Sequence, residues 1–488
     1  MKSGFQKYMA EAMLAVFVLL TASGIILGTL GQPEHKSYLI ELILSVVVLA
    51  LAVLLHRRYK EKPLFVDRWS PWLTGSIITL ICLAVNLAWV MSCKVEPSVD
   101  FYTNYMSAVN VANNDWEHLD RMYLALFPHI FGYAWFMSGF ISLFGESALL
   151  IPVINVAATV LTGIMIYLLC LHWMGRRSAA LAYLLWALCP SKLLYNTMVL
   201  PEPIYTCAIF AFLLTLSLGN TVSEKGGSAL WFVPEAVIGL LSGAVLHWMN
   251  MLRPLASIWF IALFIWLLLL RCWKKKCLRP KLMWAVFVLC MLVSFRVADS
   301  NWMNIETQRL GEEPASFPAY SIYVGLDEES GGSYSEVDMD KLMNYRYDRE
   351  NGSAVWAQEQ MLNEVKQQLR TDGVNVLRLL RVKLPKFLGS DEGGAFYSKA
   401  SLTDTQFKLT SALSNVFYYC VVLLGIYGAY KMAKEKTGSL MLILPLFCVG
   451  LTLAHIIVEV AGRYKYCLIP MFIVIAAYAS SGNKARHM

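Results

Sequence analysis

Long apolar runs recur along this sequence. They limit how the chain can fold more than any other feature does. Each run is roughly 17–24 residues long, the length of an α-helix that crosses a hydrocarbon core of about 30 Å. Hydrophobic residues make up 57% of the chain and charged residues only 15%, against about 25% charged in soluble proteins. The sequence therefore predicts an all-α polytopic membrane protein with about twelve transmembrane helices. The runs lie at 13–31, 38–55, 72–92, 148–171, 178–190, 203–219, 234–250, 254–271, 281–297, 407–430, 438–456 and 465–481.

Lysine and arginine are concentrated in a few connecting segments, and this asymmetry predicts the orientation of the chain. Cytoplasmic loops of membrane proteins carry an excess of these residues. With twelve spans and a cytoplasmic N-terminus, every basic segment falls on the cytoplasmic side, and so does the C-terminus. The net charge of +7 therefore does not indicate nucleic-acid binding. The basic segments are 56–68, 172–177, 271–281, 431–436 and the tail with Lys484 and Arg486.

One further apolar segment, 128–144, must be left out of this count for the orientation to hold. Its sequence, PHIFGYAWFMSGFISLF, is short, rich in aromatic residues and begins at Pro128. Trp and Tyr favour the headgroup level of a bilayer. We expect a helix that lies in the outer interface; a span here would instead move Arg176 and Arg177 to the outside.

Two large polar regions remain on the outer side. The first, 93–147, follows the third apolar run, and the second, 298–405, contains a basic amphipathic stretch at 373–389. That stretch is typical of a helix that lies on a membrane surface or packs over the spans. The expected divisions are an extra N-terminal two-helix hairpin and cytoplasmic loop (1–71), a transmembrane core (72–297) with the catalytic outer loop 93–147, an extracytoplasmic cap (298–406) and C-terminal helices (407–488).

Two acidic residues at the edges of spans are candidates for chemistry, because ionisable groups are costly there. Asp100 lies in V-D-F-Y, shortly after the run that ends near Met91. It suits a general base, and it equally suits the cap of a helix that begins at Phe101. Glu202 lies between two prolines where an outer loop re-enters the membrane, so it is either a site carboxylate or an acid in a solvated turn.

Basic and aromatic residues accompany these acids on the outer side. Arg463, Tyr464 and Lys465 form a basic aromatic rim that suits a lipid phosphate, although such residues also anchor helices in the interface. Further candidates for substrate or phosphate binding are Arg253, before Pro254, together with Lys192 and Tyr102.

The order of these motifs resembles that of the GT-C integral-membrane glycosyltransferases, in particular the branch of protein O-mannosyltransferases and aminoarabinose transferases. The shared pattern is an acid in the first large outer loop, a proline-led helix, a span ending in G-R-R, a second outer acid, R-P, and a late R-Y before a proline. In this chain the motifs are Asp100, 128–147, Gly175–Arg176–Arg177, Glu202, Arg253–Pro254 and Arg463–Tyr464 with Pro470.

The chain departs from that branch in three respects. Two additional spans, 13–31 and 38–55, precede the usual first element, and Phe101 stands where a second acid is common after the first. The oligosaccharyltransferase signature W-W-D-Y-G is absent from the sequence. These departures leave the branch and the substrate open.

The resemblance implies transfer of a sugar from a polyprenyl-phosphate donor to an acceptor on the outer side of the cell membrane. The acceptor would be a cell-envelope glycan, a glycolipid or a protein. Asp100 would be the base, Arg463 with Arg253 or Lys192 would hold the phosphate, and Glu202 would orient a cation, the acceptor or a basic group. Some relatives hold a divalent metal between such acids, so Mg²⁺ or Mn²⁺ at Asp100 and Glu202 is one option. The alternative function is a transporter or flippase of a lipid-linked saccharide.

Overall fold

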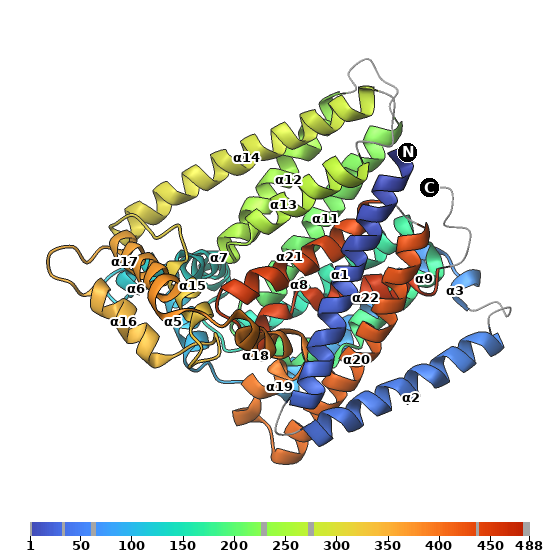
Figure 1. Cartoon of the computed structure of the whole chain (residues 1–488), viewed down its shortest axis with the longest axis horizontal. Helices are drawn as coiled ribbons and strands as arrows, with labels where there is room; N and C mark the ends of the chain where they lie inside the picture. The colour runs from blue at the N-terminus through green and yellow to red at the C-terminus, as the bar shows by residue number, and fades with distance from the viewer. Residues whose placement is uncertain are drawn as a thin grey trace.

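The computed structural model describes residues 2–31, 35–59, 65–225, 232–271, 278–435 and 439–481. Within these ranges the chain is helical and contains no β-strand (Figure 1). The predicted all-α architecture is therefore confirmed, and the apolar helices make this a multi-pass membrane protein. Of the predicted basic clusters, residues 60–64 and 272–277 and the tail residues Lys484 and Arg486 lie outside the described ranges.

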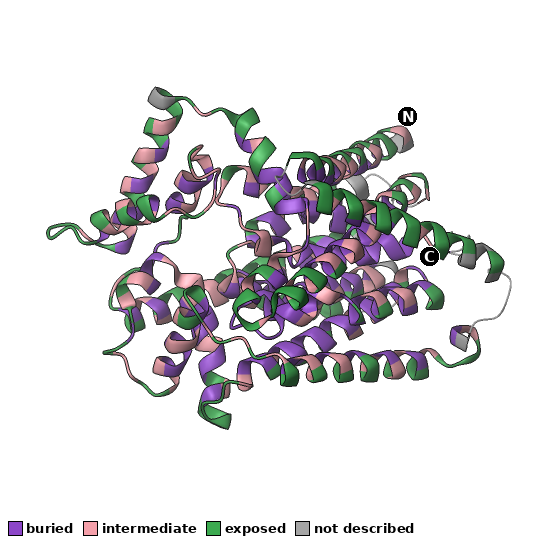
Figure 2. Ribbon diagram, turned by 90° about the horizontal axis from the view of Figure 1, so that it is seen from below, coloured by how far each residue is buried: buried purple, intermediate pink, exposed green. Residues whose placement is uncertain are grey.

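Nine helices in the described part of the chain are long and apolar enough to cross a membrane. Figure 2 shows exposed residues along their outer faces. Many of these are large apolar side chains, as expected where lipid replaces water. They are α1 (Lys2–Gly31), α2 (His35–Tyr59), α4 (Pro71–Ser92), α8 (Leu150–Trp173), α11 (Glu202–Lys225), α12 (Phe232–Leu252), α14 (Leu278–Leu310), α20 (Asp404–Glu435), and α21 (Ile443–Ile457) extended by the 3₁₀ turn η4 (Leu440–Leu442).

The predicted count of twelve spans is not confirmed, because three apolar runs form shorter helices. The run 178–190 forms α9 (Arg176–Ala187), which stops before Pro190 because proline cannot continue a helix. The run 254–271 forms α13 (Ala256–Ile265) and the π-helix η1 (Trp266–Arg271). The run 465–481 forms α22 (Leu468–Tyr478), in which every residue is buried by protein.

Residues 100–144 and 319–372, which belong to the segments predicted for the outer side, lie together at one end of the bundle (Figure 1, left). They share a second apolar cluster, which includes Phe131, Tyr320 and Met361. Their helices are α5 (Asp100–Ala112), α6 (Arg121–Leu126), α7 (Pro128–Phe144), α15 (Ala319–Leu326), α16 (Glu336–Arg346), α17 (Ala354–Gln367) and the π-helix η2 (Gln368–Asp372).

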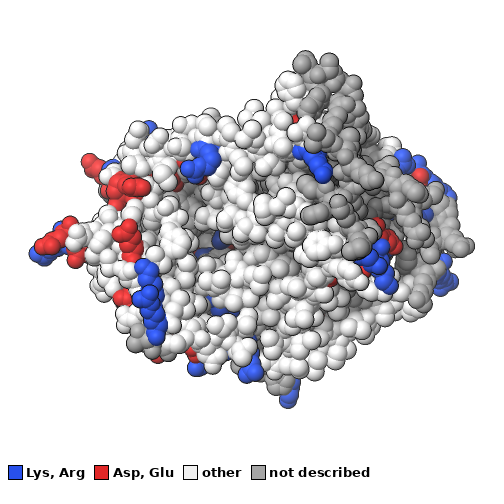
Figure 3. All heavy atoms as spheres, turned by 45° about the horizontal axis from the view of Figure 1, so that its top comes forward, with Lys and Arg blue, Asp and Glu red and all other residues white. Residues whose placement is uncertain are grey.

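Contacts also join segments that were predicted for the cytoplasmic side. Arg177, at the start of α9, pairs with Asp67 of α3 (Phe65–Arg68) over 2.6 Å. Lys431, near the end of α20, donates a hydrogen bond to the carbonyl of Ser481. On the face drawn in Figure 3 a broad uncharged surface separates charged groups that gather mainly towards the two ends, as expected for a protein that crosses a bilayer.

The helix α7 begins at Pro128 as predicted and is packed tightly into the protein. A Cβ atom at Gly132 would lie 2.3 Å from the carbonyl oxygen of Met251 in α12, so only glycine permits this close crossing. Which membrane depth α7 occupies stays a prediction.

The predicted amphipathic stretch forms α18 (Val376–Leu388), which packs over α1 and α21. Its Lys383 is buried and donates to the carbonyls of Gly325, Ile456 and Val458 at 2.7–3.0 Å. This lysine therefore binds free carbonyls at the end of α21. The shorter elements α10 (Pro190–Tyr195), α19 (Gly393–Tyr397), η3 (Lys399–Ser401) and η5 (Gly462–Lys465) complete the fold.

Candidate active site

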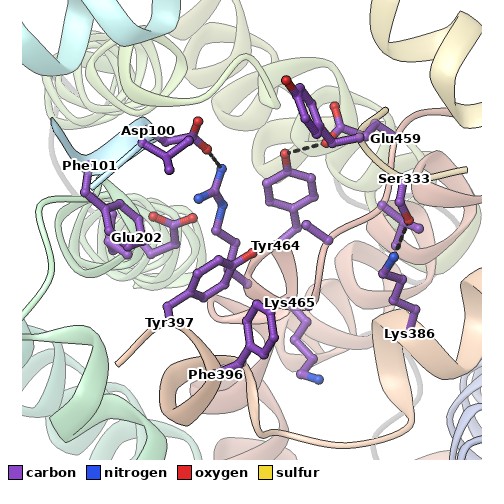
Figure 4. A pocket seen from close by; sticks show the side chains of 18 of the residues that line it. Asp100, Phe101, Glu202, Ser333, Lys386, Phe396, Tyr397, Glu459, Tyr464 and Lys465 are labelled. Atoms are coloured by element: carbon purple, nitrogen blue, oxygen red, sulfur yellow. Dashed lines mark hydrogen bonds and ion pairs between the residues drawn. The ribbon is translucent and has the colours of Figure 1, made fainter. Parts of the chain in front are cut away.

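A cavity of about 1960 Å³ lies where the outer segments meet the spans (Figure 4). Asp100 and Glu202 both line it. They come from the first residues of α5 and α11, and η5 faces them with Arg463. Residues separated by hundreds of positions in the sequence thus converge at the boundary of the membrane spans.

Asp100 does not act as a helix cap. The N-cap of α5 is Val99, and no side chain caps this helix end. Instead Oδ2 of Asp100 accepts a hydrogen bond from Nη2 of Arg463 at 2.6 Å. The backbone before the acid is strained, because Val99 has a φ of +48°, which a β-branched residue rarely adopts. Such strain costs about 1–3 kcal/mol and is typical of functional sites.

Glu202 is the buried acid of the site. It opens α11 between Pro201 and Pro203, where the missing proline N–H groups cost nothing because first-turn donors have no helical partner. Its side chain is only 4% exposed, and Nη2 of Arg253 donates to its Oε1. The guanidinium of Arg253 also lies 4.8 Å from the ring centre of Tyr464. A buried carboxylate is thus neutralised by an arginine that is itself held against an aromatic ring.

Arg463 lies among three aromatic rings. Its guanidinium carbon is 5.4 Å from the ring centre of Tyr397, 5.7 Å from that of Tyr464 and 5.9 Å from that of Phe101. These rings and Asp100 hold the cation where it faces the cavity. A planar guanidinium presents several N–H donors at once, so the same side chain can bind Asp100 and a second anion.

Several buried polar atoms at this site find no hydrogen-bond partner among the described residues. They are Nε of Arg463, Nε of Arg253, Oε2 of Glu202 and the hydroxyl of Tyr133. Buried polar groups in proteins are nearly always satisfied, so a cluster of exceptions needs an explanation. A polar ligand that accepts from the arginines provides one.

Three further residues of the cavity did not figure among the predicted site residues. His129, the second residue of α7, is held neutral because burial, helped by Arg253 and Arg463, lowers its pKa to about 3. Burial likewise raises the pKa of Glu459, and Oη of Tyr464 donates to this acid at 3.3 Å. Lys386 of α18 donates to the Ser333 hydroxyl. His129 directly follows Pro128, which opens the proline-led helix of the family motif at 128–147. This position is the one sequence signal that could have indicated His129 as a site residue.

The structure does not bring every predicted residue to the cavity. Tyr102, Tyr464 and Lys465 line it. Arg253 reaches it through Glu202 and Tyr464 rather than as a lining residue. Lys192 does not: it is fully buried and donates to Oδ1 of Asn86 at 3.2 Å and to the carbonyl of Ala187 at 3.0 Å. Its ammonium binds the free end of α9, so its position does not support phosphate binding.

The acids of the cavity are not arranged as metal ligands. Asp100 and Glu202 each accept from an arginine. The described part of the chain holds no cluster of three or more His, Cys, Asp or Glu residues that could bind an ion. The described residues therefore do not fit a Mg²⁺ or Mn²⁺ site at Asp100 and Glu202.

Part of this chain matches a family of known proteins. Residues 128–297 match the family described as dolichyl-phosphate-mannose-protein mannosyltransferase. A search of curated proteins gives no match. Among solved structures, the chain is similar to the archaeal oligosaccharyltransferase AglB from Archaeoglobus fulgidus in complex with an inhibitory peptide and a dolichol-phosphate, with 13% identity and a TM-score of 0.46. That similarity covers 85% of this chain and 50% of the other, so this chain spans half the length of that relative. The family match confirms the resemblance of this chain to the GT-C superfamily of integral-membrane glycosyltransferases.

Proposed function

We propose that this protein transfers a sugar from a polyprenyl-phosphate donor to an acceptor hydroxyl on the outer side of the membrane. The observation that carries the proposal is the contact between Asp100 and Arg463 in one cavity at the membrane boundary. A proton acceptor thus lies beside a phosphate-binding cation, the two groups that this reaction needs. Both termini would lie in the cytoplasm, and the cavity would open outside.

Asp100 acts as the general base. The acceptor hydroxyl loses its proton to this carboxylate as its oxygen forms a bond to the anomeric carbon. The bond from that carbon to the phosphate oxygen breaks, and its electron pair leaves with the phosphate. The side chain of Asp100 is 51% exposed, so an acceptor can reach it.

Arg463, which lines the cavity, holds the leaving phosphate, and the charge of Arg253 supports it from behind Glu202 and Tyr464. Each arginine has a buried Nε without a partner among the described residues. Charge-assisted hydrogen bonds from guanidinium groups to phosphate oxygens are strong and often bidentate. They become most favourable as negative charge develops on the leaving group, so they stabilise the transition state. Glu202 orients Arg253 for this role.

The size and lining of the cavity support simultaneous binding of donor and acceptor. Sites for single small ligands are usually about 300–1,000 Å³, whereas this cavity measures about 1960 Å³. Its lining is rich in tyrosine, which offers both an apolar ring and a hydroxyl to a sugar. The aromatic lining includes Tyr38, Tyr102, Tyr123, Tyr320, Tyr334 and Tyr397.

A direct test incubates the purified protein with a panel of polyprenyl-phosphate sugars and candidate acceptors and measures release of polyprenyl phosphate. We expect release with at least one sugar and a glycosylated acceptor in equal amount. Parallel reactions with EDTA and with added Mg²⁺ or Mn²⁺ test metal dependence. Transport of an unaltered lipid-linked saccharide across a bilayer, without release of polyprenyl phosphate, would refute the proposal.

A further inference from the structure

The N-terminal hairpin of α1 and α2 is a departure from the pattern of the resembled family, yet it reaches the cavity. Gly28 of α1 and Tyr38 of α2 both line it. A Cβ atom at Gly28 would lie 2.7 Å from Cα of Gly389 at the end of α18. The hairpin therefore contacts the backbone where α18 leads into residues 389–392, and Gly389, Ser390 and Glu392 of this segment line the cavity.

Two polar side chains of α2 are directed at this same segment. Oη of Tyr38 donates to Oε1 of Glu392 at 2.7 Å. Glu41 lies within a membrane-spanning helix, is only 7% exposed and accepts from Nδ2 of Asn415 at 2.9 Å. Oδ1 of the same Asn415 accepts from the backbone N–H of Asp391 at 2.7 Å. A carboxylate inside a span is costly, and such residues usually serve a function.

The segment 389–392 in turn holds basic groups of the cavity. Lys465 is 2% exposed and donates to the carbonyl of Ser390. The hydroxyl of Ser390 donates to Glu392 at 3.3 Å. Burial lowers the pKa of Lys465, and the buried carboxyl of Asp391 beside it opposes that shift. Lys465 also belongs to η5, the same short helix as Arg463. The position of segment 389–392 therefore affects the position of Arg463, the proposed phosphate-binding residue.

We propose that Tyr38 and Glu41 are positioning residues for the transfer reaction proposed above, and that they act by holding segment 389–392, and with it Lys465 and η5, in place at the cavity. The hairpin is then a working part of the substrate site rather than an additional membrane anchor. Tyr418 and Tyr419 of α20 also bind this segment, through the carbonyls of Leu388 and Gly389 at 2.8 and 3.0 Å. The hairpin fixes its other end, at Asp391 and Glu392.

The first experiment measures positioning without any need for activity. The purified full-length protein, its Tyr38→Phe variant and its Glu41→Leu variant are treated briefly with a small amine-acylating reagent, and modification of Lys465 and Lys386 is followed by mass spectrometry. One lost hydrogen bond is worth about 0.5–1.5 kcal/mol, which corresponds to a roughly 2–12-fold rise in acylation of Lys465. Lys386 is already exposed and serves as the internal reference. Tyr8→Phe on exposed α1 surface is the matched control.

Pairwise coupling identifies the partner of Tyr38. In a Glu392→Ala background the bond from Tyr38 to Glu392 is already lost, so Tyr38→Phe should raise the acylation of Lys465 by less than it does in the wild-type background. Unchanged acylation of Lys465 in both hairpin variants would overturn the proposal. A rise shared by Lys386, or by the Tyr8→Phe control, would overturn it as well, because it would report a general loosening of the fold.

The second experiment connects positioning to the reaction. With polyprenyl-phosphate-mannose as the probe donor, we expect Tyr38→Phe to raise the donor KM by roughly 2–12-fold and to lower kcat in the same variant, because the segment also positions Arg463 in η5. A changed Lys465 acylation with an unchanged donor KM would refute the link to substrate binding. If wild-type protein releases no polyprenyl phosphate from any donor, the proposed function fails while the acylation result still decides the role of the hairpin.

Discussion

The substitution Asp100→Asn separates chemistry from structure at the centre of the site. Asparagine keeps the size of the side chain and an oxygen that can accept from Arg463, but it cannot take a proton at neutral pH. General base catalysis contributes about 10²–10⁴-fold, so turnover should fall by that factor, which equals about 2.7–5.4 kcal/mol of barrier. The protein itself should be little affected: the Asp100 side chain is 51% exposed, and exposed ion pairs contribute only about 0–1 kcal/mol.

The assay measures release of labelled polyprenyl phosphate together with donor affinity and thermal unfolding. Donor affinity should stay the same or rise slightly, because Arg463 loses a competing charge. The matched control is Asp115→Asn, which removes a 40% exposed carboxylate that pairs with His118 in the same outer region but does not line the cavity. Turnover of the Asp100→Asn protein within about threefold of wild type, far above the loss expected of a base, would refute the reasoning. Glu202 would then be the next candidate base.

Four further outcomes are expected. Arg463→Ala should raise the donor KM and lower kcat together, with a combined loss in kcat/KM of roughly 10–150-fold, because charged hydrogen bonds are worth about 1.5–3 kcal/mol; an effect on kcat alone would exclude a role in donor binding. Glu202→Gln leaves Arg253, whose side chain is 18% exposed, without its counter-charge and should lower the free energy of unfolding by up to about 3–5 kcal/mol, seen as a lower melting temperature. Ser330→Cys should react with a membrane-impermeant maleimide from the outside only; reaction from the cytoplasm would reverse the topology. Burial raises the pKa of Asp338 to about 6, so its ionisation opposes folding and wild-type stability should fall as pH rises from about 4 to about 6; Asp338→Asn should remove that fall, and identical melting curves against pH would contradict it.

At the candidate site, residue type alone did not predict which charged side chains reach the cavity or what role each has there. Lys192 and Arg253 both lie near prolines at predicted outer turns, so the sequence could not show which of them is closer to the phosphate site. The fold turns Lys192 inward to the end of α9 and turns Arg253 towards Glu202. The sequence also could not distinguish a general base from a helix cap at Asp100. Capping depends on the backbone angles of Val99 and on which residue starts the helix, and only the structure shows these.

Local sequence by itself determined the helical, membrane-spanning character of this protein. The length of an apolar run and the position of a proline each affect only the helix in which they occur, so no distant contact is needed to predict them. The start of α7 at Pro128 and the end of α9 before Pro190 are examples. Tertiary structure alone decided which residues share the cavity. Asp100 meets Arg463 across 363 positions, and Tyr38 meets Glu392 across 354, and no local pattern encodes contacts of that range. Burial decided two further features: the neutral form of His129, and the guanidinium nitrogens that find no partner in the described part of the chain. Both exist because packing removes these groups from solvent.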